Sequence, residues 1–163
     1  MKHFKCLLLC ATLVGATLVA SASSPQIRGG RDLIDTAMSV HRFDTFLMLV
    51  RDADLTFTLK DGGPFTVFAP TDDAFRAMPQ GLLAKIHGNK PRLRQFVLHH
   101  IVRGRLSAQQ AVRARSMSVL DGGKIPSHNM KGQGMIGHAR FTITNIHTSN
   151  GILHGMDRVL MSK

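Results

Sequence analysis

Histidine is the side chain of this sequence best suited to chemistry near neutral pH, and the chain has nine of them. Imidazole nitrogens bind zinc, copper and iron, and they also act as general bases. His99 and His100 are adjacent, whereas the others are scattered, and no two are four residues apart as on one face of a metal-binding helix. We therefore predict no metal site and no cofactor, with a convergence of His128, His138 and His147 as the alternative.

Paired arginines are the second group with a chemical use. Three Arg-x-Arg pairs occur in a chain whose net charge is +11. The planar guanidinium group matches phosphate, sulfate and carboxylate groups, so a basic protein outside the cytoplasm would be drawn to acidic polysaccharide or lipopolysaccharide. A solvated basic surface without a dedicated partner is the alternative. The predicted partner-binding residues are Arg92, Arg94, Arg103, Arg105, Arg113 and Arg115, together with His99 and His100.

Residues for catalysis, or for reading a nucleic-acid sequence, are scarce. The chain contains no Gly-x-Ser-x-Gly motif, and all ten of its acidic residues are aspartates. Its one pair of adjacent carboxylates, Asp72 and Asp73, lies where a helix should begin and is better explained as helix capping. Tyrosine and tryptophan are absent, which leaves few rings for stacking on bases. We predict that the protein is not an enzyme and does not bind nucleic acid sequence-specifically.

A strand followed directly by a capped helix is expected around this aspartate pair. Val67 and Phe68 belong to a short apolar run that is typical of a buried strand. Pro70 cannot donate a ladder hydrogen bond, so the strand should end there. Thr71 then occupies the N-cap position, and Asp72 lies in the first helical turn, where a carboxylate complements the helix dipole.

A β-hairpin is expected near the C-terminus, around Asn150-Gly151. Both residue types tolerate positive φ, and this dipeptide is the strongest short-range signal for a hairpin turn. Before it, residues 140–145 alternate in polarity as in a half-buried strand, and Ile152 begins the returning strand. Gly155 interrupts the returning strand, which indicates a bulge or a close backbone approach.

These two segments, in this order, resemble the two signature segments of the fasciclin (FAS1) domain. The resemblance implies an α+β fold in which a β-wedge or sandwich of about seven strands is flanked by several short α-helices. It also implies a secreted or surface module that binds partners without turning them over. His99-His100 stands where vertebrate members carry a Tyr-His pair linked to integrin recognition. The residues that carry the resemblance, with structural roles, are Thr66, Phe68, Pro70, Thr71, Asp72 and Phe75 in the first segment and Asn150, Gly151, His154 and Asp157 in the second.

Outside the two signature segments, the hydrophobic pattern favours helices in the first half of the chain and strands in the second. A turn is expected at Asp121-Gly122-Gly123. In the helix that Pro91 opens, His100 shares the apolar face of Phe96, so we expect a core position for His100 and partial exposure for His99. The expected helices cover 33–38 and 43–50, and others follow Pro79, begin at Pro91 and are capped by Ser107.

Residues 1–30 are expected to lie outside the folded domain. A positively charged start, an apolar stretch and a small-residue motif predict a signal peptide over residues 1–22, which export would remove. Both cysteines fall within it, so the exported chain should carry no disulfide. Residues 23–30 are predicted to be a flexible tether, and residues 31–163 a single domain. We expect a secreted or periplasmic monomer without a transmembrane segment after cleavage.

The function that these observations favour is that of an exported, non-catalytic binding module for cell adhesion or for contact with the extracellular matrix. Its expected partner is a cell-surface or matrix protein, or an anionic polysaccharide or lipopolysaccharide. A groove near His99 would supply selectivity, and the arginine pairs would supply electrostatic attraction. The alternative is a periplasmic carrier or sensor of a small ligand, haem or metal, which histidines would hold.

Overall fold

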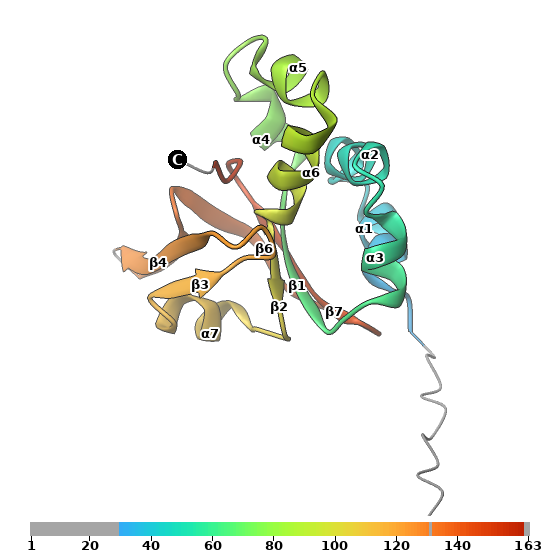
Figure 1. The fold of residues 1–163 in the computed structure, drawn as a ribbon. Coiled ribbons are helices and arrows are strands. Elements are labelled where there is room, and N and C mark those ends of the chain that lie inside the picture. Colours follow the sequence, from blue (N-terminus) through green and yellow to red (C-terminus); the bar gives the residue numbers. More distant parts are fainter. Residues whose placement is uncertain (1–29, 131, 162–163) are drawn as a thin grey trace, which may run out of the picture.

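The computed structural model describes residues 30–130 and 132–161, which form one β-sheet covered by short helices (Figure 1). The predicted signal peptide, and the predicted tether up to residue 29, lie outside the described residues. None of the helices in the described ranges is long and apolar enough to cross a lipid bilayer. The helices are α1 (Leu33–Val40), α2 (Asp44–Asp52), α3 (Thr56–Asp61), α4 (Asp72–Arg76), α5 (Leu82–His87), α6 (Lys90–Leu98) and α7 (Ala108–Arg113). The strands are β1 (Phe65–Pro70), β2 (Ile101–Arg103), β3 (Ser116–Ser118), β4 (Lys124–Met130), β5 (Gln133–Ile136), β6 (Ala139–Thr148) and β7 (Gly151–Met156).

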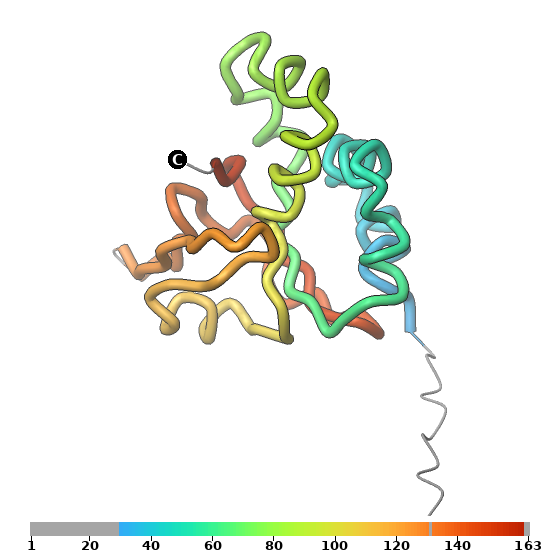
Figure 2. Tube along the Cα trace, in the orientation of Figure 1, coloured from blue at the N-terminus to red at the C-terminus, as the bar shows by residue number. Residues whose placement is uncertain are grey.

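The seven strands follow the order β2-β1-β7-β6-β5-β4-β3. β1 and β7 run parallel, with Phe68 opposite His154, and the other neighbouring strands are antiparallel. The two signature segments therefore lie side by side, as the green and red strands of Figure 2 show. A bridge between Val102 and Val119 joins the two ends of the sheet, so the sheet is nearly closed. The predicted α+β class and number of strands are confirmed.

The hydrophobic core has two parts, which lie on opposite faces of strand β1. Val67 and Ala69 face a cluster formed mainly by α1 to α6, whereas Phe68 belongs to a second cluster inside the wedge of strands. Figure 1 shows the corresponding layers, with α1, α2 and α3 along one side of the sheet and α7 at the end away from α5. All six residues of β1 are buried because apolar layers cover both faces of this strand.

The first signature segment folds as predicted, and its carboxylate has an additional role. The hydroxyl of Thr71 accepts a hydrogen bond from the backbone N–H of Ala74 at the start of α4. Asp72 Oδ1 accepts a hydrogen bond from the N–H of Thr45 at 2.8 Å, so this carboxylate also binds the first turn of α2. Burial opposes ionisation of Asp72, but hydrogen bonds from Thr45 outweigh it and hold the pKa of this carboxyl below its usual value.

The second signature segment forms the predicted hairpin, but its turn lies one residue earlier and has a different physical basis. Thr148 pairs with Gly151, so the loop residues are Ser149 and Asn150. Neither Asn150 nor Gly151 is among the described residues with positive φ, which corrects our expectation for this dipeptide. Gly151 is needed for space instead, because a Cβ atom there would overlap the carbonyl oxygen of Phe65 on the parallel strand β1.

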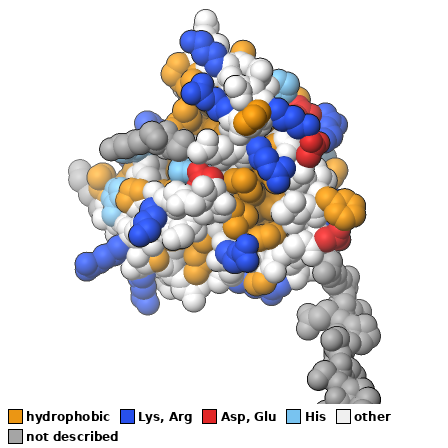
Figure 3. Space-filling model, viewed as in Figure 1, with side chains coloured by type: hydrophobic (Ala, Val, Ile, Leu, Met, Phe, Trp, Pro, Cys, Tyr) orange, Lys and Arg blue, Asp and Glu red, His pale blue; other side chains and the backbone are white. Residues whose placement is uncertain are grey.

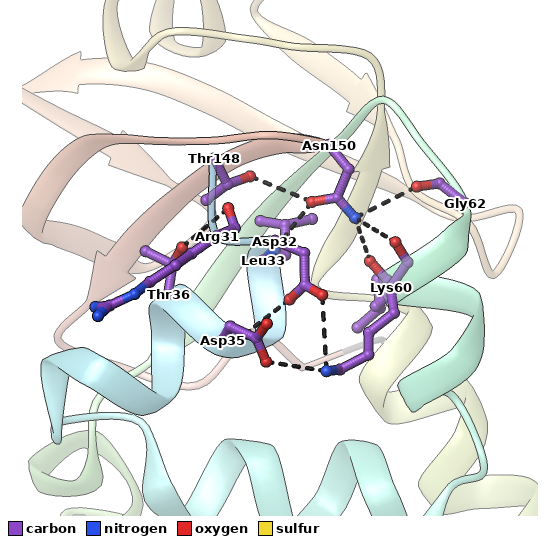
Figure 4. A network of polar contacts seen from close by, with 10 residues as sticks. Arg31, Asp32, Leu33, Asp35, Thr36, Lys60, Gly62, Thr148 and Asn150 are labelled. Atoms are coloured by element: carbon purple, nitrogen blue, oxygen red, sulfur yellow. Dashed lines mark hydrogen bonds and ion pairs between the residues drawn. The ribbon is translucent and has the colours of Figure 1, made fainter. Parts of the chain in front are cut away.

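Asn150 is buried and connects the hairpin to two helices (Figure 4). Its Oδ1 atom accepts hydrogen bonds from the N–H of Leu33 at 2.9 Å and from the hydroxyl of Thr148 at 3.3 Å. One side chain therefore joins α1, the chain around the end of α3, and the β6–β7 turn. The sequence pattern had not indicated α3 at all. The Nδ2 group of Asn150 donates hydrogen bonds to three carbonyl oxygens around the end of α3, those of Leu59, Lys60 and Gly62.

Gly155 marks a close approach and an irregularity in pairing, as predicted. A Cβ atom at this position would lie 2.8 Å from the hydroxyl oxygen of Thr142 on β6. The register between β6 and β7 shifts between Ile143 and Ile146, and Asn145 within this bulge has a φ of 58°. The bulge lets the side chain of Asn145 reach the N–H of Ala108, which begins α7.

Candidate recognition groove

A groove of about 640 Å³ opens where four separate parts of the chain meet. These are the C-terminal end of α6, the β3–β4 turn, the β5–β6 turn, and the segment that follows β7. The volume is within the usual range for sites that bind small molecules or short segments of larger ones. Its lining includes Gln95 and His99 from the first part, Asp121 and Lys124 from the second, His138 from the third, and Val159, Leu160 and Met161 from the fourth.

His99 and Asp121 form a buried hydrogen-bonded pair in the wall of this groove. His99 Nδ1 and Asp121 Oδ2 are 2.7 Å apart, and the two side chains are 7% and 4% exposed. Asp121 Oδ1 accepts a second hydrogen bond from the N–H of Gly123 at 2.8 Å, which fixes the carboxylate. Our expectation of a partly exposed His99 is wrong, because the β3–β4 turn folds over the imidazole.

The second ring nitrogen of His99, Nε2, belongs to a side chain that lines the groove. Within the described ranges Nε2 has no hydrogen-bond partner, and the only unpartnered buried side-chain polar atom there is Ser127 Oγ. Nε2 therefore keeps contact with solvent. Because the Asp121 carboxylate accepts from Nδ1–H, Nε2 is an acceptor in the neutral ring and a donor in the imidazolium.

His100 is a core residue, as the helical pattern predicted. It is 0% exposed, so the direct partner contact that we predicted for it is excluded. Its Nδ1–H donates to the carbonyl oxygen of Phe96 at 2.8 Å, and its Nε2 accepts from the N–H of Leu160 at 3.1 Å. Burial lowers the pKa of His100 from 6.5 to about 4, so the ring is neutral at physiological pH.

The bond from Leu160 to His100 gives the buried ring a positioning role in the groove. Leu160 lies in the segment after β7, which supplies the apolar residues Val159, Leu160 and Met161 to the lining of the groove. His99 and His100 thus have different roles. The side chain of His99 lines the groove, and the ring of His100 positions the backbone of Leu160 in the groove wall.

His154, the histidine of the second signature segment, is structural. Its ring stacks on that of Phe68 with a centroid distance of 5.5 Å and an interplanar angle of 17°. Its Nε2–H donates to the carbonyl oxygen of Leu106 at 2.9 Å, and its Nδ1 accepts from the N–H of Asn145 at 3.1 Å. Burial lowers the pKa of His154. Both nitrogens are used to hold β7 against the β6 bulge and the chain before α7.

Asp157 also has a structural contact. Its Oδ1 accepts a hydrogen bond from the N–H of Arg140 at 2.7 Å, and its own N–H donates to the carbonyl oxygen of Arg140 at 3.0 Å. This reciprocal pair fastens the chain after β7 to the beginning of β6.

The six arginines of the predicted pairs are all exposed, and none of them lines the groove. Within residues 30–130 and 132–161, none of these arginines forms an ion pair with a carboxylate. Arg92 and Arg94 lie on α6, whereas Arg113 lies on α7, and Figure 1 shows these two helices at different ends of the molecule. The arginine pairs and the His99 groove are therefore separate features.

The groove offers groups for recognition. The imidazole of His99, the ammonium group of Lys124 and the amide of Gln95 line a space that also has an apolar wall. No serine, threonine or cysteine is among the described residues that line it. In the described part of the chain, no three His, Cys, Asp or Glu side chains are grouped to hold a metal ion, so His128, His138 and His147 do not converge into a site.

Asp121 is the residue of this site that the sequence analysis missed. Asp121-Gly122-Gly123 was interpreted only as a turn, which it is, between β3 and β4. One available signal was its isolation, because it is the only acidic residue between Asp73 and Asp157. A lone carboxylate in a strongly basic stretch is a candidate partner for a buried histidine.

Comparison with known proteins gives consistent relatives. Residues 41–162 match the family described as the Fasciclin domain. The chain is 32% identical over 130 residues to "Uncharacterized protein sll1735" of Synechocystis sp., which covers 80% of this chain and 97% of that protein. It is 27% identical over 110 residues to "Cell surface glycolipoprotein MPB83" of Mycobacterium bovis, which covers 68% of this chain and 49% of that protein. A solved FAS1 domain pair from the insect cell adhesion molecule fasciclin I has a similar fold, with a TM-score of 0.64 at 13% identity, over 81% of this chain and 51% of the pair.

Proposed function

Because this chain belongs to the fasciclin domain family, we propose that it is an exported, non-catalytic module that binds a partner at a cell surface or in an extracellular matrix. Fasciclin domains occur in adhesion proteins, of which insect fasciclin I is one. The relative MPB83 is a cell surface glycolipoprotein, which supports a location outside the cytoplasm.

The observation that carries the proposal is the open nitrogen of His99. Three histidines of the described chain are buried, and two of them, His100 and His154, have both ring nitrogens hydrogen-bonded within the protein. His99 is 6% exposed, and only one of its ring nitrogens is hydrogen-bonded within the described chain. Burying both His99 and Asp121 has a desolvation cost, and one hydrogen-bonding position of the imidazole is nevertheless left unpaired beside the groove. This arrangement favours a role of the imidazole in binding.

In this proposal, a polar group of the partner binds His99 Nε2, and an apolar part of the partner packs against the wall formed by Val159 and Leu160. Lys124 at the same groove favours an acidic group nearby. The partner is a cell-surface or matrix protein, or an anionic polysaccharide or lipopolysaccharide. The exposed arginines would raise the rate of encounter with a partner of that charge.

A second candidate function is that of a periplasmic carrier or sensor of a small ligand. The volume of the groove and its apolar wall favour it, because small-molecule sites typically combine apolar lining with a few polar groups. A carrier should purify with a bound compound that native mass spectrometry detects and that is lost from a His99→Ala variant.

The adhesion proposal is tested by measuring how the purified exported chain binds to immobilised cells and matrix proteins in moderate and high salt. His99→Ala and the rim variant Lys124→Ala should each weaken binding roughly tenfold, and His128→Ala, an exposed histidine on β4, should not. Thermal unfolding of each variant checks that the fold is kept. Lys124 is exposed, so its replacement should not change the stability of the protein. If both groove variants bind as tightly as the wild type, the groove is not the recognition site.

A further inference from the structure

The acidic residues of this protein are concentrated in one part of the fold, which leaves the rest strongly basic. Eight of the ten aspartates lie between Asp32 and Asp73, which covers α1 to α4. Residues 77–163 contain thirteen lysines and arginines but only two aspartates. Of these two, Asp121 is buried against His99, and Asp157 is bound to the backbone of Arg140. On the face in Figure 3, acidic atoms lie mostly over the helices at the right, whereas Lys and Arg side chains are spread over the whole face.

A second cleft, of about 510 Å³, lies within the basic part of the molecule, between α7 and the strands β4, β5 and β6. Arg113 from α7 and Arg140 from β6 both line it, and neither has an ion-pair partner within the described ranges. None of the described residues that line it is acidic. Its other polar lining residues are Gln109, Asn129, Gln133 and Thr144, and its apolar ones include Val112 and Phe141.

The walls of this α7 cleft are held in place by specific contacts. A capping box between Ser107 and Gln110 fixes the start of α7, and Asn145 Oδ1 accepts a hydrogen bond from the N–H of Ala108 at 3.0 Å. Val112 of α7 also packs closely on Gly134 of β5, so a Cβ atom added to Gly134 would overlap the side chain of Val112. The cleft is therefore preformed, which lowers the entropy cost of binding.

We infer that the α7 cleft binds an acidic sugar unit of an anionic polysaccharide. Guanidinium groups of Arg113 and Arg140 match a carboxylate or sulfate, since both anions accept paired hydrogen bonds from the planar fork. Carboxamide side chains both donate and accept, which suits hydroxyl groups, and the half-buried ring of Phe141 offers an apolar contact for a sugar face.

The same lining argues against two other polyanions. Nucleic-acid strands are bound by a series of aromatic stacking platforms as well as by phosphate contacts, and Phe141 is the one aromatic ring among the described residues that line the cleft. Phosphate oxygens only accept hydrogen bonds, so phosphate groups alone would use the donors but not the acceptors of the three carboxamides of the cleft. The inference rests on the proposed function, because it names the chemical class of an extracellular partner and adds a second contact site to the His99 groove.

The test compares binding of defined oligosaccharides by calorimetry at about 0.15 M salt. The probes are an oligogalacturonate, which carries carboxylates, a sulfated oligosaccharide of similar length, and a neutral malto-oligosaccharide. The cleft variant is Arg113→Gln with Arg140→Gln. The matched control is Lys85→Gln with Arg42→Gln, which removes the same charge from exposed positions on α5 and just before α2, away from α7.

We expect at least one acidic oligosaccharide to bind the wild type, the cleft variant to bind it about tenfold more weakly, and the control variant to stay within about twofold. The two acidic probes show whether carboxylate or sulfate is preferred. Equal losses in the two variants would overturn the inference, because net charge alone would then explain binding. Tighter binding to single-stranded DNA, to anionic lipid vesicles or to the neutral sugar would also overturn it.

The outcome separates this inference from the proposed function. If no oligosaccharide binds but the protein still adheres to cells or matrix through His99, the saccharide inference alone fails. If neither the oligosaccharides nor any cell or matrix preparation binds, both proposals fail.

Discussion

Because the ring of His100 is buried, we expect the protein to lose stability at acid pH. Below about pH 6.5 the unfolded chain binds a proton at this histidine, whereas the folded protein does not until the pH reaches about 4. Unfolding therefore takes up a proton in this window and is favoured as the pH falls. The difference between the two pKa values corresponds to about 3 kcal/mol of stability, present above pH 6.5 and lost by about pH 4.

The assay is urea denaturation at a series of pH values across this window, for the wild type and His100→Asn. The amide of asparagine can replace the donor to Phe96, but it leaves the N–H of Leu160 unpaired, so the variant should lose about 1–3 kcal/mol at neutral pH. It no longer titrates, so its free energy of unfolding should fall by roughly 1.4 kcal/mol less per pH unit than that of the wild type.

Two features isolate the effect. Asp72, whose pKa is lowered, acts in the same way in the wild type and in His100→Asn, and His128→Asn, at an exposed position, should leave the wild-type slope unchanged. His154 contributes in the same direction and stays in both proteins, so the variant keeps part of the acid sensitivity. Identical slopes for the wild type and His100→Asn would refute the assignment of a buried neutral ring.

Two further changes test the second signature segment. Asn150→Ala should lower the free energy of unfolding by about 3–5 kcal/mol, because it leaves the N–H of Leu33 and carbonyls near the end of α3 without their partner; chemical denaturation measures it, and a loss below 1 kcal/mol would mean that water replaces the amide. Gly151→Ala should cost about 3 kcal/mol, because the methyl group meets the carbonyl of Phe65. Thermal unfolding measures this cost, with Gly30→Ala as the control, because a Cβ atom at Gly30 would lie 3.8 Å from the nearest atom. Equal melting temperatures for Gly151→Ala and Gly30→Ala would contradict the steric argument.

Local features of the fold were predictable because their causes are local. The N-cap of Thr71, the capping box of Ser107 and the turn at Asp121-Gly122-Gly123 each depend on a few consecutive residues, and the structure contains all three. The core position of His100 followed from helical periodicity. Although α6 ends at Leu98, the turn after it keeps His100 beside the apolar face of the helix, where its ring is bonded to the carbonyl of Phe96.

The exposure of His99 could not be predicted in the same way. Periodicity describes one face of one helix, and it placed His99 away from that face. In the structure a turn 22 residues further along the chain covers the ring and supplies a carboxylate. Which turn lies above the end of α6 depends on the path of the whole sheet, so the pair of His99 and Asp121 has no signature in consecutive residues.

The sequence by itself determined the family, the capped helices, the hairpin and the excess of basic residues, because each is expressed in neighbouring positions or in composition. Only the tertiary structure decided what these parts do together. Gly151 is required because a parallel strand passes against it, and Asn150 because α1 begins and α3 ends beside it. The His99 groove and the α7 cleft likewise exist only where segments far apart in the chain are brought together, because burial and ligand geometry depend on neighbours in space.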